Sequence, residues 1–189
     1  MTIAEIQKEC GAVLKRGGLI LYPTDTVWGI GCDATNAEAI DRVYALKKRA
    51  DNKALITLVC DFTMLRQFIE EVPQVAYDVL NFAVKPTTII YDDPIRVATN
   101  LIASDNTLAV RVIKEPFCNK IIKKFRKPIV STSANVSGQP TPRSFAEISE
   151  EIKNGVDFIV PIEQNAKKVG KPSVIIKISN SGNVKVIRE

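Results

Sequence analysis

Strand-like apolar segments alternate with helical segments along most of this 189-residue chain, and this alternation constrains the fold more than any other feature. A Ser or Thr followed three residues later by Glu is typical of a helix N-terminus, because each side chain can bond the other's backbone N–H. Such pairs predict three helix starts: Thr2 with Glu5, Thr35 with Glu38, and Ser144 with Glu147. Further helices are expected after Asp61, from about Pro73, and over residues 116–125.

The apolar segments are short and rich in Ile, Val and Leu, which favours buried strands. They cover residues 19–22, 29–32, 54–60, 87–91, 108–112, 128–132, 157–160, 173–178 and 184–188. The last two are expected to form a hairpin across Asn180-Ser181-Gly182. Strands that alternate with helices and end in a hairpin predict a mixed α/β (α+β) fold, in which helices cover a twisted sheet of parallel and antiparallel strands.

The bulk composition is that of a globular protein, with 46% hydrophobic and 25% charged residues. The length predicts one domain spanning residues 1–189. No apolar run approaches the roughly 18 residues of a membrane span, and the N-terminus lacks the pattern of an export signal. We therefore expect a cytoplasmic protein without a membrane partner.

The chain contains no histidine, which removes the commonest general base and the commonest metal ligand. Its four cysteines are far apart in sequence and form no Cys-x-x-Cys pair, so buried free thiols are expected in place of a metal site or disulfides. Chemistry in such a chain depends on Lys, Arg, carboxylates, hydroxyls and backbone groups, with Mg²⁺ as the metal to consider.

Two stretches of small polar residues follow apolar strands, residues 22–31 (YPTDTVWGIG) and residues 131–138 (STSANVSG). Hydroxyl, amide and glycine residues at strand ends are typical of a binding cleft, although each stretch alone also fits a tight turn. Between them lie Lys47 and Arg49, whose charges suit a triphosphate but equally fit the solvated end of a helix. Neither of the common glycine-rich phosphate loops is present.

Five motifs in this order give the chain a resemblance to the YrdC-like family of threonylcarbamoyl-AMP synthases. They are Tyr22-Pro23-Thr24 with Gly29-Ile30-Gly31, Lys47-Lys48-Arg49, Ala109-Val110-Arg111, Ser133-Ala134-Asn135 and Pro172-Ser173. The resemblance extends from about Gly17 to Arg188 and implies the YrdC-like fold in its short single-domain form.

The resemblance implies a nucleotidyltransferase that converts L-threonine, bicarbonate or CO₂, and ATP into threonylcarbamoyl-AMP and pyrophosphate. This product serves a tRNA modification next to the anticodon, so the implied partners include the downstream tRNA-modifying transferase machinery. The carbamate of threonine would attack the α-phosphorus of ATP in line, which needs positioning and charge stabilisation more than a protein nucleophile.

Site residues follow from the same resemblance, motif by motif. Lys47 and Arg49 would be catalytic and hold the ATP phosphates, with Mg²⁺ sharing their charge. The remaining ATP contacts would be Thr107, Asn135, Thr141 and Arg188, and L-threonine would bind Thr24, Arg111, Ser133 and Ser173. Independently of the resemblance, a charge that ends an apolar strand, as Arg111 does, requires a partner, either a ligand carboxylate or a nearby acidic side chain.

The chain also departs from the family pattern. Ala50 and Ala54 stand where prolines are usual, residues 83–86 (AVKP) replace Trp-Pro-Gly-Pro, and Ile113 replaces a further proline. These changes affect loops that shape the site and bear on substrate preference.

Two alternatives remain open at this point. One is a related enzyme that adenylates a different carbamoyl substrate. The other is a non-catalytic binder of RNA, including double-stranded RNA, that uses the basic clusters at residues 120–127 and 167–171. The low aromatic content of 6% leaves few stacking platforms for RNA bases, so RNA binding is expected to be weak.

Overall fold

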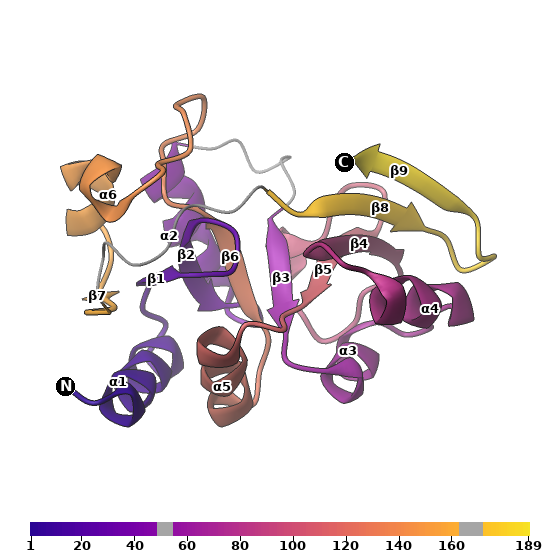
Figure 1. Cartoon of the computed structure of the whole chain (residues 1–189), viewed down its shortest axis with the longest axis horizontal. Helices are drawn as coiled ribbons and strands as arrows, with labels where there is room; N and C mark the ends of the chain where they lie inside the picture. The colour runs from indigo at the N-terminus through magenta and orange to yellow at the C-terminus, as the bar shows by residue number, and fades with distance from the viewer. Residues whose placement is uncertain (49–54, 163–171) are drawn as a thin grey trace.

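The computed structural model describes residues 1–48, 55–162 and 172–189, and these form a nine-stranded mixed sheet with helices packed against it (Figure 1). The strand order is β7-β1-β2-β6-β3-β5-β4-β8-β9. Neighbours pair in both senses, for example β3 with β5 in parallel and β2 with β6 antiparallel. The predicted mixed α/β fold is confirmed.

The elements follow the predicted alternation closely. The strands are β1 (Ile20–Pro23), β2 (Trp28–Asp33), β3 (Ile56–Val59), β4 (Thr87–Asp92), β5 (Thr107–Val112), β6 (Ile129–Ser133), β7 (Phe158–Ile159), β8 (Val174–Ile178) and β9 (Val184–Arg188). The α-helices are α1 (Ile3–Lys15), α2 (Ala37–Lys47), α3 (Phe62–Phe68), α4 (Gln74–Phe82), α5 (Pro116–Phe125) and α6 (Glu150–Asn154). The short 3-10 helices are η1 (Thr99–Leu101) and η2 (Phe145–Glu147).

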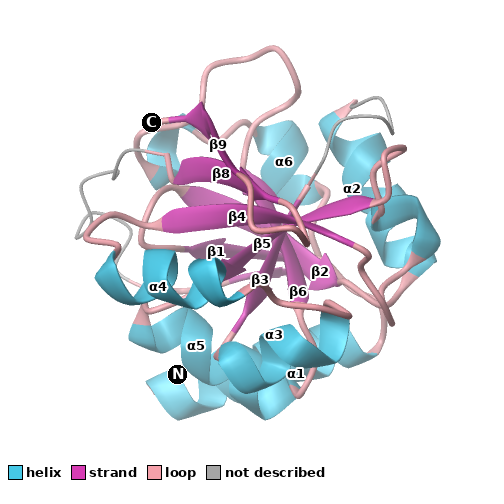
Figure 2. Cartoon of the chain, turned by 90° about the vertical axis from the view of Figure 1, so that its right-hand side faces the viewer, coloured by secondary structure: helices cyan, strands magenta, loops and turns pink. Residues whose placement is uncertain are grey.

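One of the three predicted capping boxes forms as expected. The Thr2 side chain accepts a hydrogen bond from the backbone N–H of Glu5, and the Glu5 carboxylate accepts one from the backbone N–H of Thr2. This reciprocal pair opens α1, which packs beside α5 under the sheet (Figure 2).

The other two helix starts were predicted at the wrong residue. The Thr35 hydroxyl donates to Asp33, so Asn36 caps α2 instead, accepting from the backbone N–H of Ala39. Near α6, Ser144 makes no cap bond and precedes only the 3-10 helix η2, whereas the hydroxyl of Ser149 accepts from the start of α6. The Glu147 carboxylate accepts instead from the backbone N–H of Arg143, so in both cases a side chain of the expected pair bonds another local partner, which a capping pattern in the sequence does not reveal.

The helices cover the sheet unequally. In Figure 1, α1, α5, α3 and α4 lie below the sheet, and α2 and α6 lie at the opposite side near β1 and β2. The β8–β9 hairpin extends from the far edge, with Gly182 at φ +83° in its turn. The described strands thus form one sheet, and β9 at its edge contributes no residue to the buried core.

Candidate functional site

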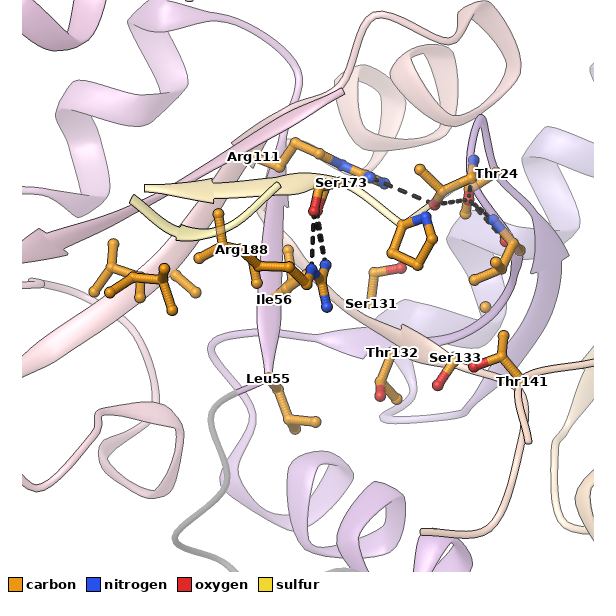
Figure 3. Close-up of a pocket in the computed structure, with 18 residues that line it drawn as sticks. Thr24, Leu55, Ile56, Arg111, Ser131, Thr132, Ser133, Thr141, Ser173 and Arg188 are labelled. Carbon is orange, nitrogen blue, oxygen red and sulfur yellow. Dashed lines mark hydrogen bonds between the residues drawn. The ribbon is translucent and has the colours of Figure 1, made fainter. Parts of the chain in front are cut away.

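A cavity of about 370 Å³ lies on the open face of the sheet. Its floor is one row of register neighbours, since Ser131 pairs with Ile56, Ile56 with Ala109, and Ala109 with Ile90. Residues in one row point to the same face, so strands from distant parts of the sequence present one surface. The cavity is lined by Thr24, Thr26, Val27, Gly29, Leu55, Ile56, Ile90, Ala109, Arg111, Ser131, Thr132, Ser133, Thr141, Pro172, Ser173, Ile175, Ile187 and Arg188 (Figure 3).

The lining is polar at one end and apolar at the other. Hydroxyls from the β1–β2 turn and from β6 line the cavity together with Arg111, whereas Ile56, Ile90, Ile175 and Ile187 supply apolar lining. A ligand that fits both ends has a charged, hydrogen-bonding part and a flat or apolar part.

Thr24 organises the β1–β2 turn. Its hydroxyl donates to the carbonyl of Val27 at 2.7 Å and accepts from the backbone N–H groups of Thr26 and Val27 at 3.1 and 3.2 Å. It also lies 3.0 Å from the Thr26 hydroxyl. The turn is therefore tied together by one side chain, and Thr24 and Thr26 are held at the cavity wall.

Arg111 is buried at the polar end, with 4% of its surface exposed. One guanidinium nitrogen lies 3.2 Å from a carboxylate oxygen of Asp25, and another donates to the Thr26 hydroxyl at 3.4 Å. The Asp25 pair is close but not aligned as a hydrogen bond, and the buried Arg111 Nε has no hydrogen-bond partner among the described residues. The local carboxylate anticipated from the sequence is present, yet the guanidinium keeps donor capacity for a ligand.

Ser173 and Arg188 form the opposite wall. The guanidinium of Arg188 donates two hydrogen bonds to the Ser173 carbonyl, at 3.1 and 2.8 Å, as Figure 3 shows. The Ser173 hydroxyl lies 2.9 Å from that of Thr88 on β4. Two predicted site residues from the last strands of the chain thus meet across the β8–β9 hairpin.

Lys47 holds the loop that follows β6. Its side chain is buried, with 1% exposed, and its ammonium group donates to the carbonyls of Ser133 and Asn135. The Lys47 carbonyl in turn accepts from the backbone N–H of Ser137 at 2.8 Å. The end of α2 is therefore fastened to the second polar stretch, and Lys47 itself does not line the cavity.

The other predicted ATP contacts are more dispersed. Thr141 lines the cavity, but Asn135 does not, and its amide nitrogen donates to the carbonyls of Val136 and Gln139. Thr107 lies at the far end of β5 from Arg111 and donates to Asp105 at 2.6 Å. Arg49 and the basic cluster at residues 167–171 lie outside the described residues. The structure thus brings together Thr24, Arg111, Ser133, Thr141, Ser173 and Arg188.

Several lining residues carry no signature in the sequence. The isoleucines of the floor look like ordinary core residues, and only the pairing of five strands shows that they face one cavity. Ser131 and Thr132 belong to the predicted polar stretch, but neither was predicted to bind a ligand. Alternation along β6 could have assigned Ser131 to the same face as Ser133, because side chains two residues apart share a face.

The buried free thiols expected from the sequence are confirmed. All four cysteines are free and buried, and burial raises the pKa of Cys60 to about 11 and that of Cys10 to about 12. Over the described ranges, no helix is both long enough and apolar enough to cross a membrane.

A protein-family model, Sua5_yciO_yrdC, described as telomere recombination, matches residues 12–189. The threonylcarbamoyl-AMP synthase of Hahella chejuensis is 34% identical over 165 residues, covering 87% of this chain and 89% of that protein. The protein of the same name from Pseudoalteromonas translucida is 34% identical over 151 residues, covering 78% of this chain and 80% of that protein.

Solved structures agree in fold. P. abyssi Sua5 complexed with L-threonine superposes with a TM-score of 0.81 at 25% identity and covers 94% of this chain. The chain spans about half of that protein, 52% of its length. E. coli YciO superposes with a TM-score of 0.83 at 23% identity, covering 100% of this chain and 90% of its own, which supports the fold.

Proposed function

The chain belongs to the Sua5, YciO and YrdC family, and we propose that it is a threonylcarbamoyl-AMP synthase. In this reaction the amine of L-threonine adds to CO₂ derived from bicarbonate and loses a proton, giving a carbamate. A carbamate oxygen then attacks the α-phosphorus of ATP, and pyrophosphate leaves. The proposal treats residues 1–189 as one catalytic domain in the cytoplasm, where its product reaches the tRNA-modifying transferase machinery.

The observation that carries the proposal is the incompletely bonded Arg111 guanidinium at the polar end of the cavity. A buried guanidinium is costly without full pairing, and a carboxylate is its best planar partner. The threonine carboxylate would complete the set, with Thr24, Ser133 and Ser173 around the amino acid. Because Asp25 already offsets part of the positive charge, a single carboxylate is a better match than a more highly charged group.

ATP in this proposal occupies the remainder of the cavity. The isoleucine floor can cover a flat base, and Arg188 and Thr141, which line different sides of the cavity, would contact phosphate or ribose oxygens. Lys47 would act on the phosphates together with Arg49, and it also holds the Ser133–Asn135 backbone that borders them. For Thr107 and Asn135, contact with ATP remains a prediction from the sequence.

Mg²⁺ in this proposal is bound through the phosphates of ATP and shares their charge with the basic residues. Within the described ranges, no three His, Cys, Asp or Glu side chains group together as a metal cage. Binding through phosphate oxygens is the usual mode for Mg²⁺ in nucleotide sites, because the ion keeps several of its waters. A further proposed interaction is weak RNA binding by the basic cluster at residues 120–127.

The direct test follows ³²P-labelled ATP with purified protein, Mg²⁺ and bicarbonate, in the presence and absence of L-threonine. We expect an adenylate product and pyrophosphate to appear only when both threonine and bicarbonate are present. Replacing threonine by serine or carbamoyl phosphate tests for a different carbamoyl substrate. Folded protein that binds ATP but releases no pyrophosphate with threonine would contradict the proposal.

A further inference from the structure

Tyr22 and Ser131 make a buried hydrogen bond across an intervening strand. The Tyr22 hydroxyl on β1 donates to the Ser131 hydroxyl oxygen on β6 at 2.9 Å, although 109 residues separate them. Strand β2 lies between β1 and β6, so the bond spans two strand spacings, about 10 Å. A tyrosine ring is long enough for that distance, provided that nothing stands on β2 in its path.

Two glycines keep that path open. A Cβ atom on Gly31 would lie 2.8 Å from a ring carbon of Tyr22 and 3.1 Å from the carbonyl oxygen of Val130. A Cβ atom on Gly29 would lie 3.1 Å from the Ser131 hydroxyl oxygen. The Gly29-Ile30-Gly31 stretch therefore lets the ring of Tyr22 lie across β2 and reach Ser131.

The bond determines how the Ser131 hydroxyl can be used. A serine hydroxyl has one proton to donate and two lone pairs to accept with, and Tyr22 occupies one lone pair. Burial raises the pKa of the Tyr22 hydroxyl, so it stays protonated and remains the donor. Among the described residues, the Ser131 proton has no acceptor on the protein, and Ser131 lines the cavity that contains Arg111.

We propose that Tyr22 is a positioning residue that directs the Ser131 hydroxyl proton into the cavity, where it donates to the carboxylate that Arg111 also binds. The inference rests on the proposed function, which supplies L-threonine as the ligand. In this proposal three stretches of the sequence act together. Residues 22–24 provide the tyrosine ring, residues 29–31 leave space for it, and residues 131–133 provide the hydroxyl that donates to the substrate.

The test is a double-mutant cycle on the binding of L-threonine, measured by calorimetry without ATP. Tyr22→Phe removes only the hydroxyl and is expected to weaken threonine binding about three- to tenfold, the effect of one net hydrogen bond. Ser131→Ala is expected to weaken it at least as much. Adding Tyr22→Phe to Ser131→Ala should then cause no further loss, because Tyr22 acts only through Ser131.

Tyr91→Phe is the matched control. Tyr91 is a second buried tyrosine in the same sheet, and its hydroxyl has no hydrogen-bond partner among the described residues, so threonine affinity should be unchanged. Thermal unfolding of each variant separates loss of the fold from loss of affinity. If Tyr22→Phe does not fold, Ser131→Ala and Ser131→Thr carry the test. Affinity for the ligand L-threonine that is kept in Ser131→Thr but lost in Ser131→Ala supports the donor role of the hydroxyl at this position.

Two results would overturn the inference. Equal weakening by Tyr22→Phe with and without Ser131 would show that Tyr22 acts through the fold and not through that hydroxyl. Unchanged affinity in folded Tyr22→Phe would show that Ser131 needs no orientation. A wild-type protein that binds no threonine would instead refute the proposed function, and with it the ligand assigned to Ser131.

Discussion

The two sides of the cavity differ in how firmly the protein holds them. Every residue of β1 and β2 is buried, whereas β8 is mostly half-buried and β9 is exposed along its whole length. On the first side, Thr24, Ser131 and Arg111 are tied into turns and neighbouring strands. On the second, Ile187 remains half-exposed at the edge of the sheet.

This difference shows how one sheet can combine order with room for a ligand. The buried side fixes the direction of its donors before any ligand arrives, so little entropy is lost there on binding. The exposed side offers apolar surface that a ligand would cover, which favours binding without costing the free protein a packed core. Changes on the buried side should therefore have larger effects than changes on the exposed side.

The largest expected effect comes from Arg111. We expect Arg111→Gln to raise the KM for L-threonine about 30-fold or more, because one partner of a buried charged pair is lost, and to change the KM for ATP little. Initial rates over a range of each substrate test this. Lys127→Gln is the control, since it breaks an ion pair with Asp33 outside the cavity lining. Unchanged threonine dependence in folded Arg111→Gln would assign Arg111 to a purely structural pair with Asp25.

A smaller effect is expected on stability from Gly31. Gly31→Ala should lower the free energy of unfolding by about 1–3 kcal/mol, because the new methyl group meets the Tyr22 ring and the Val130 carbonyl. Denaturant titration measures the change. Gly11→Ala is the matched control in helix α1, where a Cβ meets nothing within 4 Å and alanine should stabilise by about 0.5–1 kcal/mol. Equal changes in the free energy of unfolding for Gly31→Ala and Gly11→Ala would show that Gly31 on β2 is not closely packed.

The smallest effect is expected at the exposed edge. The Thr107 hydroxyl and then Lys177 on β8 donate to Asp105 and lower the pKa of its carboxyl. A carboxylate with a lowered pKa stabilises the fold above its unfolded value, about 3.9, and this contribution disappears as pH falls through the folded value. Asp105→Asn should thus cost less than about 0.5 kcal/mol at pH 7, because solvent screens the pair.

Denaturant titrations of Asp105→Asn at pH 7 and at pH 2.5 check this sign. The difference from the wild-type protein should shrink at the lower pH, where the native carboxyl becomes protonated. Asp78→Asn, at an exposed position of α4, should show no difference at either pH. A larger penalty for Asp105→Asn at pH 2.5 than at pH 7 would contradict the assigned direction of the pKa shift.

Much of the fold could be predicted from the sequence, since strand and helix periodicity is a local property. The residue that starts a helix was harder, as Thr35 shows, because Asp33 competes for its hydroxyl. Motifs with distinctive chemistry pointed to Thr24 and Arg111, which line the cavity, whereas Ile56 and Ile187 line it without any chemical signature in the sequence. Lys47 was expected at a helix end beside phosphates, and its burial against the β6 loop depends on how α2 packs.

The sequence by itself determined the succession of elements, the absence of histidine, and the two polar stretches that border the cavity. These follow from local composition and periodicity. Only the tertiary structure decided that Tyr22 reaches Ser131 across glycines, that Arg111 meets Asp25, and that residues of six strands, from β6 to β9, form one floor. The physical reason is that strand order and register bring together residues more than 80 positions apart, and no local pattern encodes those pairings.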